Sequence, residues 1–232
     1  MKQAHRQVQR GNNVIPFPTR RHGAYPPIVR LSPEFDGLEL LYSNDKHPNT
    51  LFSLRILAWA HQQDGTTVAI VPWLKTAARA PELADPMNGR WEGYRLPDSD
   101  VLFEEAPGYK AAEMQAALMF FGEPDIDFDD DQTVIQEIPD TIGTHAVFSD
   151  DDFHTISLME VVSWRLMANG EMKAMVIDEN TVTTTPVLPG AKCLTAAQDR
   201  DDFRYFFQYG IANKLKEQDP EAIAAISILK GD

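Results

Sequence analysis

Two segments of the chain carry the same succession of apolar runs and turn residues, and each segment predicts a β-hairpin. They cover residues 51–74 and residues 156–179. In each segment an apolar run leads to Asp-Gly or Asn-Gly, at positions 64–65 and 169–170, and a second apolar run follows. This order of residues is the strongest short-range signal for a hairpin with a tight turn.

The two hairpins also match each other residue by residue, at an offset of 105. Trp59 corresponds to Trp164, the Asp-Gly turn to the Asn-Gly turn, and Ala69 to Ala174. So many matches without a gap indicate an internal duplication. Arg55 and Glu160 correspond as well, and we expect these opposite charges to form an ion pair if a twofold axis relates the copies.

Each hairpin is followed by further extended segments and then by a helical pattern. The extended segments lie near residues 90–96, 100–104, 181–188 and 191–195, and the helical patterns cover residues 109–121, 199–217 and 219–230. Met114, Ala117 and Leu118 share one side of the first helical pattern. We therefore predict an α+β fold with two sequence-repeat halves, in which helices cover the antiparallel sheets.

This order of elements divides the chain into four parts. We predict a basic flexible arm at residues 1–25, a first α+β repeat at 26–122, an acidic linker at 123–144, and a second α+β repeat with the C-terminal helices at 145–232. The arm contains the apolar stretch Val-Ile-Pro-Phe-Pro at positions 14–18. Its two prolines favour an extended backbone and exclude a helix there.

The charge is divided unevenly between these parts. The chain has a formal net charge of −14 from 21 basic and 35 acidic residues, yet its first 30 residues hold six of the basic residues and none of the acidic ones. The remaining 202 residues therefore carry a charge of −20. Such a body repels phosphates, so only the arm could contact a nucleic acid or another anionic surface.

Composition excludes several classes of protein as first interpretations. The apolar runs in the 232 residues are far too short to span a bilayer. The single cysteine, Cys193, excludes an intrachain disulfide and a thiolate metal cluster, and it fits a cytoplasmic location. We find no P-loop, dinucleotide-binding glycine motif, GxSxG, HExxH or CxxC sequence. The common nucleotide-binding, hydrolase and zinc-protease signatures are therefore missing.

Two sets of residues are candidates for binding a partner. The arm set comprises Arg6, Arg10, Ile15, Phe17, Arg20 and Arg21. An aromatic–arginine strip comprises Arg90, Trp91, Tyr94 and Arg95. The arm could dock in a groove, and the strip could stack on bases or grip a peptide. The alternative for the strip is that its aromatic residues pack in the core and its arginines are solvated.

Histidines and acids before the second hairpin are candidates for binding a metal or transferring a proton. His145, Asp150, Asp152 and His154 combine imidazoles with carboxylates, which suit a transition metal. The alternative is plain turn chemistry. Residues 125–131 place acids at alternate positions but lack the glycine and the closing glutamate of an EF-hand. We expect no cofactor, with a divalent cation as the alternative.

Our leading hypothesis is a non-enzymatic acidic interaction protein, a subunit or regulator of a larger assembly that docks on a protein partner through its arm. One alternative is a metal-assisted or acid–base enzyme that uses His145, His154 and a nearby aspartate. The other is a nucleic-acid mimic, whose body of charge −20 blocks a nucleic-acid-binding protein.

Overall fold

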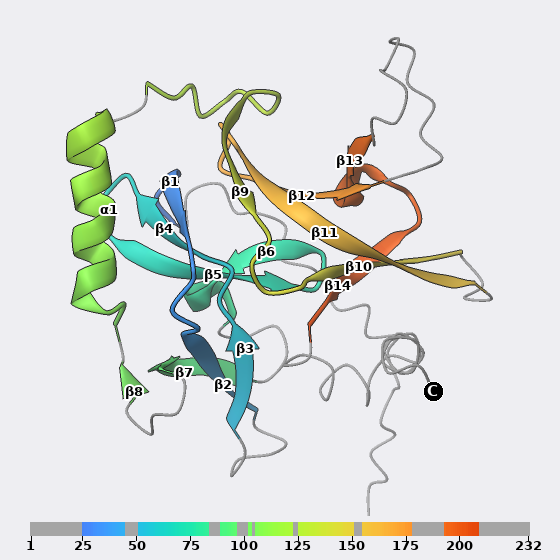
Figure 1. Ribbon diagram of the computed structural model, residues 1–232, viewed down its shortest axis with the longest axis horizontal. Coiled ribbons are helices and arrows are strands. Elements are labelled where there is room, and N and C mark those ends of the chain that lie inside the picture. Colours follow the sequence, from blue (N-terminus) through green and yellow to red (C-terminus); the bar gives the residue numbers. More distant parts are fainter. Residues whose placement is uncertain are drawn as a thin grey trace, which may run out of the picture.

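The computed structural model describes residues 25–44, 51–83, 89–96, 102–103, 105–122, 125–150, 155–177 and 193–208. Within these ranges the chain is mostly β-sheet, with three antiparallel sheets and a single α-helix at one side of the molecule (Figure 1). No helix in the described part of the chain is long and apolar enough to cross a membrane.

The first half of the described chain forms two four-stranded sheets. One has the strand order β1-β4-β5-β6 and the other β3-β2-β7-β8. The strands are β1 (Ile28–Pro33), β2 (Glu39–Asn44), β3 (Leu51–Arg55), β4 (Ala58–Gln62), β5 (Thr67–Trp73), β6 (Thr76–Arg79), β7 (Gly89–Arg95) and β8 (Leu102–Phe103). The short 3-10 helix η1 (Ala80–Leu83) follows β6, and α1 (Gly108–Phe121) follows β8.

The second half forms one six-stranded sheet. Its order is β13-β12-β11-β10-β14, and β9 also pairs with β11. The strands are β9 (Val134–Pro139), β10 (His145–Ser149), β11 (Ile156–Met167), β12 (Met172–Ile177), β13 (Leu194–Ala196) and β14 (Phe203–Phe207), with the 3-10 helix η2 (Ala197–Asp199) before β14. Residues 134–139, which we placed in the acidic linker, therefore form a strand.

Both hairpins form where the turn residues predict them, as β4–β5 and β11–β12. The turn glycines Gly65 and Gly170 have φ angles of 85° and 76°, a backbone conformation that glycine adopts without strain. Trp59 pairs with Ala69, and the equivalent Trp164 pairs with Ala174. The two hairpins therefore share one register.

The correspondence extends to the pairing of other strands. β1 pairs with β4 as β9 pairs with β11, and β5 pairs with β6 as β12 pairs with β13. β2 lies between β3 and β7 as β10 lies between the first part of β11 and β14. The ladders β2–β7 and β10–β14 also share a register shift, which follows Leu41 in the first and Val147 in the second. The two halves of the described chain therefore share the same pattern of strand pairing.

The predicted α+β class, with helices covering the sheets of two strand-and-helix repeats, is wrong. The helix expected at 199–217 includes β14, which pairs with β10. Phe203, Tyr205 and Phe206 are all buried. A strand enclosed on both faces has a continuous apolar run, which we interpreted as a helical stripe. The helix expected at 109–121 is confirmed as α1, and the one at 219–230 lies outside the described residues.

Two buried clusters hold the sheets together, and each contains residues from both halves. One cluster includes Trp59 and Val147. The other includes Ile70 and Trp164. The halves therefore share their core and depend on each other for burial of apolar surface.

Candidate functional site

A tryptophan indole donates a hydrogen bond to a carboxylate at the same place in both halves. Trp59 Nε1 donates to Glu34 Oε2 at 2.5 Å, and Trp164 Nε1 donates to Asp140 Oδ2 at 2.9 Å. Each carboxylate follows the proline that ends β1 or β9. The second carboxylate oxygen accepts backbone N–H groups of the next turn. Each tryptophan thus fixes the turn that leads to the following strand.

These two turns reveal a second repeat that we did not extract from the sequence. The order proline, acid, two residues and glycine occurs at 33–37 and again at 139–143. The glycines, Gly37 and Gly143, have φ angles of 75° and 70°. This pattern could have located both turns, because a glycine with positive φ shortly after an acidic residue is typical of a side-chain-capped turn.

The first half differs from the second because α1 brings a cation to its carboxylate. Lys110 Nζ lies 3.2 Å from Glu34 Oε2 and 2.7 Å from Asp36 Oδ2. The side chains of Lys110 and Glu34 are only 5% and 1% exposed. Burial lowers the pKa of Lys110, but the Asp36 hydrogen bond and the Glu34 charge outweigh it and raise the pKa above its usual value. The first turn of α1 is thereby fixed to the end of β1.

The two sides of α1 have different surroundings. Its inner side carries Lys110 and Met114, which are buried, and α1 packs beside β1, β4 and β5. Its other side is exposed and mostly apolar. We call the apolar residues of this side, Tyr109, Ala112, Ala116, Met119 and Phe120, the outer face of α1, and Glu113 and Gln115 are exposed beside them.

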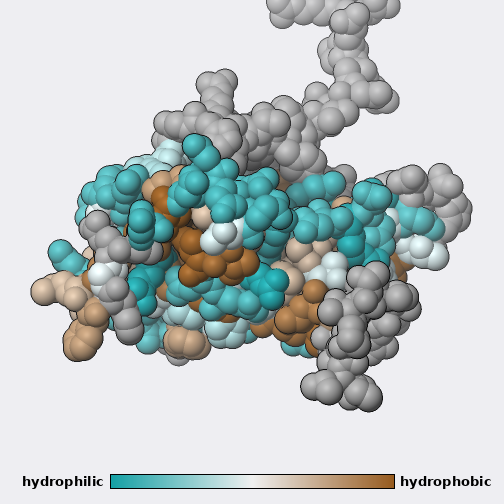
Figure 2. Space-filling model, turned by 90° about the horizontal axis from the view of Figure 1, so that it is seen from above, coloured by the Kyte–Doolittle hydropathy of each residue, from teal (hydrophilic) through white to brown (hydrophobic). Residues whose placement is uncertain are grey.

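The outer face of α1 exposes large apolar side chains. Tyr109 is 50% exposed, Met119 is 84% exposed and Phe120 is 90% exposed. In Figure 2, apolar atoms stand out at the margin where α1 lies. Apolar residues gathered in this way mark interaction surfaces. We missed this face in the sequence, although 112, 116, 119 and 120 have helical spacing and form a second apolar stripe.

Acidic residues border the outer face. The sequence from 105 to 131 contains eight acids and one base, Lys110, which Glu34 and Asp36 already neutralise. Within the acidic segment 125–131, Asp127 and Asp130 accept backbone N–H groups of their own turns. A surface with an apolar centre and an acidic border is complementary to one with an apolar centre and a basic border.

A pocket of about 320 Å³ lies where the two equivalent turns meet. Arg55 lines it, and its Nη1 donates to Ile142 O of the other half at 2.9 Å. Our prediction of an ion pair between Arg55 and Glu160 is wrong, since no nitrogen–oxygen contact within 4.0 Å joins these two described side chains. Glu39, which also lines the pocket, pairs with Arg95 at 2.7 Å.

The predicted metal ligands are not brought together where the structure describes them. His145 begins β10 and Asp150 follows its last residue. Five residue steps of extended chain separate their Cα atoms by about 16 Å, so the two side chains are too far apart to share an ion. Asp152 and His154 lie outside the described residues. In the described ranges, no group of three or more His, Cys, Asp or Glu residues could hold a metal ion.

The aromatic–arginine strip belongs to the core on one side. Tyr94 is 2% exposed, and its ring centroid lies 5.0 Å from that of Trp59 and 5.2 Å from that of Trp91. Burial raises the pKa of Tyr94 to about 12. Arg95 is held in its ion pair with a glutamate of β2. Arg90 lies in β7, and its side chain is not among those described.

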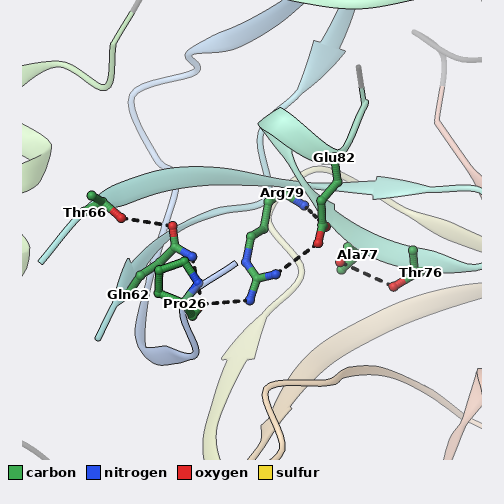
Figure 3. Close-up of polar contacts among 7 residues, drawn as sticks. All are labelled: Pro26, Gln62, Thr66, Thr76, Ala77, Arg79 and Glu82. Atoms are coloured by element: carbon green, nitrogen blue, oxygen red, sulfur yellow. Dashed lines mark hydrogen bonds and ion pairs between the residues drawn. The ribbon is translucent and has the colours of Figure 1, made fainter. Parts of the chain in front are cut away.

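The arm candidates, Arg6, Arg10, Ile15, Phe17, Arg20 and Arg21, lie outside the described residues. The described chain begins at Tyr25 and is fixed at once to the first sheet (Figure 3). Gln62 Nε2 and Arg79 Nη2 donate to Pro26 O at 2.9 and 3.3 Å. Arg79 is itself paired with Glu82 at 3.0 Å. These contacts fix the start of the described chain to β4 and β6.

Comparisons with known proteins leave the site to be interpreted from its geometry. No protein-family model, curated protein or solved structure matches this chain. Within the described residues, the outer face of α1 with its acidic border is the surface whose chemistry points most directly to binding.

Proposed function

We propose that this protein is a non-enzymatic interaction protein that binds a protein partner through the outer face of α1. The observation that carries this proposal is the exposure of Met119 and Phe120, at 84% and 90%. Burying one such side chain contributes about 1.5–3 kcal/mol. Two of them, side by side on a rigid helix, would form the centre of an interface.

The partner, in this proposal, presents an apolar surface with a basic border. The acids of residues 105–131 supply the complementary charge, because Lys110 is buried and neutralised. Such complementarity accelerates association and excludes acidic competitors. A subunit or regulator of a larger assembly fits these properties, and the single cysteine fits a cytoplasmic location.

The two alternative functions draw less support from the geometry. The separation of His145 and Asp150 along β10 weakens the hypothesis of a metal-assisted enzyme. A nucleic-acid mimic needs carboxylates in rows, whereas several carboxylates are paired with cations of the same chain. These pairs are Glu82 with Arg79, Glu39 with Arg95, Glu137 with Arg165, Asp199 with Lys173 and Asp202 with Arg200.

Affinity capture with the full-length protein as bait tests the proposal. The wild type is compared with Met119→Asp/Phe120→Asp and with a control, Ser157→Asp, at an exposed position of β11. We expect the double variant to lose about a hundredfold in affinity for the captured partner, as burial of two apolar side chains implies. All three proteins should melt at similar temperatures. Equal recovery of the partner by the double variant would contradict the proposal.

A further inference from the structure

We infer that residues 14–18 of the arm occupy the outer face of α1 in the same molecule, so that a partner must displace them. This inference rests on the proposed function of that face. It assigns the arm a regulatory role in place of direct docking on the partner. Four observations support it: the position of the outer face, the acidic segment beside it, the composition of the arm and the length of chain that joins them.

The outer face ends close to the point where the arm leaves the body. Lys110 holds the first turn of α1 at the end of β1, through Glu34 and Asp36. From there α1 runs back along β1 toward its first residue (Figure 1). The 14 residues of α1 cover about 21 Å, and β1 covers about 20 Å. Phe120 therefore lies near the level of Ile28.

The acidic segment 125–131 lies next to the same place. Asn169 N donates to Asp130 O at 2.9 Å, which fixes this segment to the β11–β12 turn. In that turn, a Cβ atom added to Gly170 would lie 4.0 Å from Ile28 N. The first residue of β1 therefore touches the turn that carries the acidic segment. This residue lies beside a segment with five acids in seven residues, and the described chain reaches three residues further, to Tyr25, whose ring centroid lies 5.6 Å from Arg79 Cζ.

The basic and apolar residues of the arm follow the same order as the acidic segment and the apolar outer face of α1. Arg20 and Arg21 come shortly before the described chain begins, and they can pair with the carboxylates of 125–131. Residues 14–18 come next toward the N-terminus and are all apolar. Five extended residues cover about 15 Å, and the helix rises about 16 Å from Tyr109 to Phe120. The apolar segment thus has the length of the outer face.

The connecting chain is long enough to allow this contact. Six residues lie between position 18 and Tyr25, and the seven Cα–Cα steps from 18 to 25 can span up to about 24 Å. Because the arm is attached to the same chain, its effective concentration at the outer face is in the millimolar range. An arm from a second molecule competes only at the much lower concentration of the protein. The tether therefore favours the arm of the same molecule.

Disulfide trapping in the full-length chain tests this contact. Cys193→Ser removes the only native thiol, and Phe17→Cys with Ala116→Cys then places one thiol on each surface. Because a disulfide needs Cα atoms about 4.4–6.8 Å apart, mild oxidation reports close contact. We expect most chains to form an intrachain disulfide. The control pair, Phe17→Cys with Ser157→Cys, should stay reduced, since β11 begins on the opposite side of the molecule from α1 (Figure 1).

A second variant tests the regulatory consequence. Ile15→Asp/Phe17→Asp in the full-length chain should raise the affinity for the captured partner, because the arm no longer competes for the outer face. A fall in affinity would mean that the arm itself contacts the partner, and it would overturn the inference. An intrachain disulfide no more abundant than in the control pair, or one that forms only between two chains, would overturn it as well.

The two experiments separate this inference from the proposed function. If Met119→Asp/Phe120→Asp loses the partner and no intrachain disulfide forms, the outer face binds the partner and the inference fails alone. If the disulfide forms while that double variant keeps the partner, the outer face binds only the arm. The proposed function then fails, and with it the regulatory part of the inference.

Discussion

Lys110 makes the contacts with the clearest consequences at the scale of single residues. It is buried, it belongs to the only α-helix of the described chain, and it faces two carboxylates at the end of β1. A buried ion pair adds little net stability, but removal of one partner leaves an uncompensated charge in the interior. The equivalent carboxylate in the second half, Asp140, likewise accepts from backbone N–H groups and from Trp164.

Lys110→Met should lower the free energy of unfolding by about 3–5 kcal/mol, because Glu34 would remain buried without its cation. Urea denaturation of the purified protein measures this change. The double variant Lys110→Met/Glu34→Gln is the matched control, and it should recover part of the loss because no unpaired charge remains. An equal loss in both variants would show that packing of the lysine stem, and not its charge, is responsible.

The same contact predicts how the effect of Lys110→Met depends on pH. The pKa of Lys110 is raised above 10.5. Its contribution to the free energy of unfolding is therefore present below that value and disappears as the pH rises through the folded-state pKa. The hydrogen bond from Lys110 lowers the pKa of Asp36 below 3.8, so its contribution disappears only as the pH falls through that lower value. The difference between the two proteins should therefore be constant around neutral pH.

At the scale of elements, the turns after β1 and β9 connect the two sheet regions of each half. Each turn needs a carboxylate, a tryptophan from a neighbouring strand and a glycine with positive φ. The glycine is the most local of these requirements. At Gly143 a side chain would lie in open space, so only backbone strain would oppose it.

Gly143→Ala should destabilise the protein by about 1–2 kcal/mol, the cost of a left-handed conformation for a residue with a Cβ atom. The thermal midpoint and a urea titration would measure this effect. Gly108→Ala is the matched control, because its Cβ also meets no atom within 4 Å and its φ is not in the left-handed range. Similar losses for the two variants would contradict the assignment to backbone strain.

At the scale of the whole molecule, the equivalent strands β1 and β9 are joined by one side chain. The amide of Gln136 donates to Leu31 O and accepts from Leu31 N, both at 2.8 Å. This side chain therefore imitates a backbone partner across the boundary between the halves. Both buried clusters also cross that boundary. We expect the halves to unfold together.

Gln136→Ala should lower the free energy of unfolding by about 1–3 kcal/mol, because two backbone groups of Leu31 lose their partners. Hydrogen exchange should then show the same opening free energy for β5 and β12, in the variant and in the wild type. Exchange of one hairpin at a much lower free energy than the other would contradict a shared core.

Much of the local structure could be predicted, whereas most of the candidate site could not. The Asp-Gly and Asn-Gly turns and the α1 pattern act within a few residues, so the sequence alone determined them. We recognised the repeat only at its hairpins and missed it at the turns of residues 33–37 and 139–143, and most other equivalent strands share little sequence although they share their pairing. The arm and half of the proposed metal ligands stay predictions, since they lie outside the described residues.

The tertiary structure alone decided which partner each apolar or charged group has. Glu34, Trp59 and Lys110 are far apart in the sequence and meet because α1 returns to the end of β1. The apolar run around Phe203 forms a strand because it pairs with β10. Helical spacing places apolar residues on more than one side of α1, and we predicted only one of these sides. Only packing decided which of those sides faces the sheet and which leaves Met119 and Phe120 exposed.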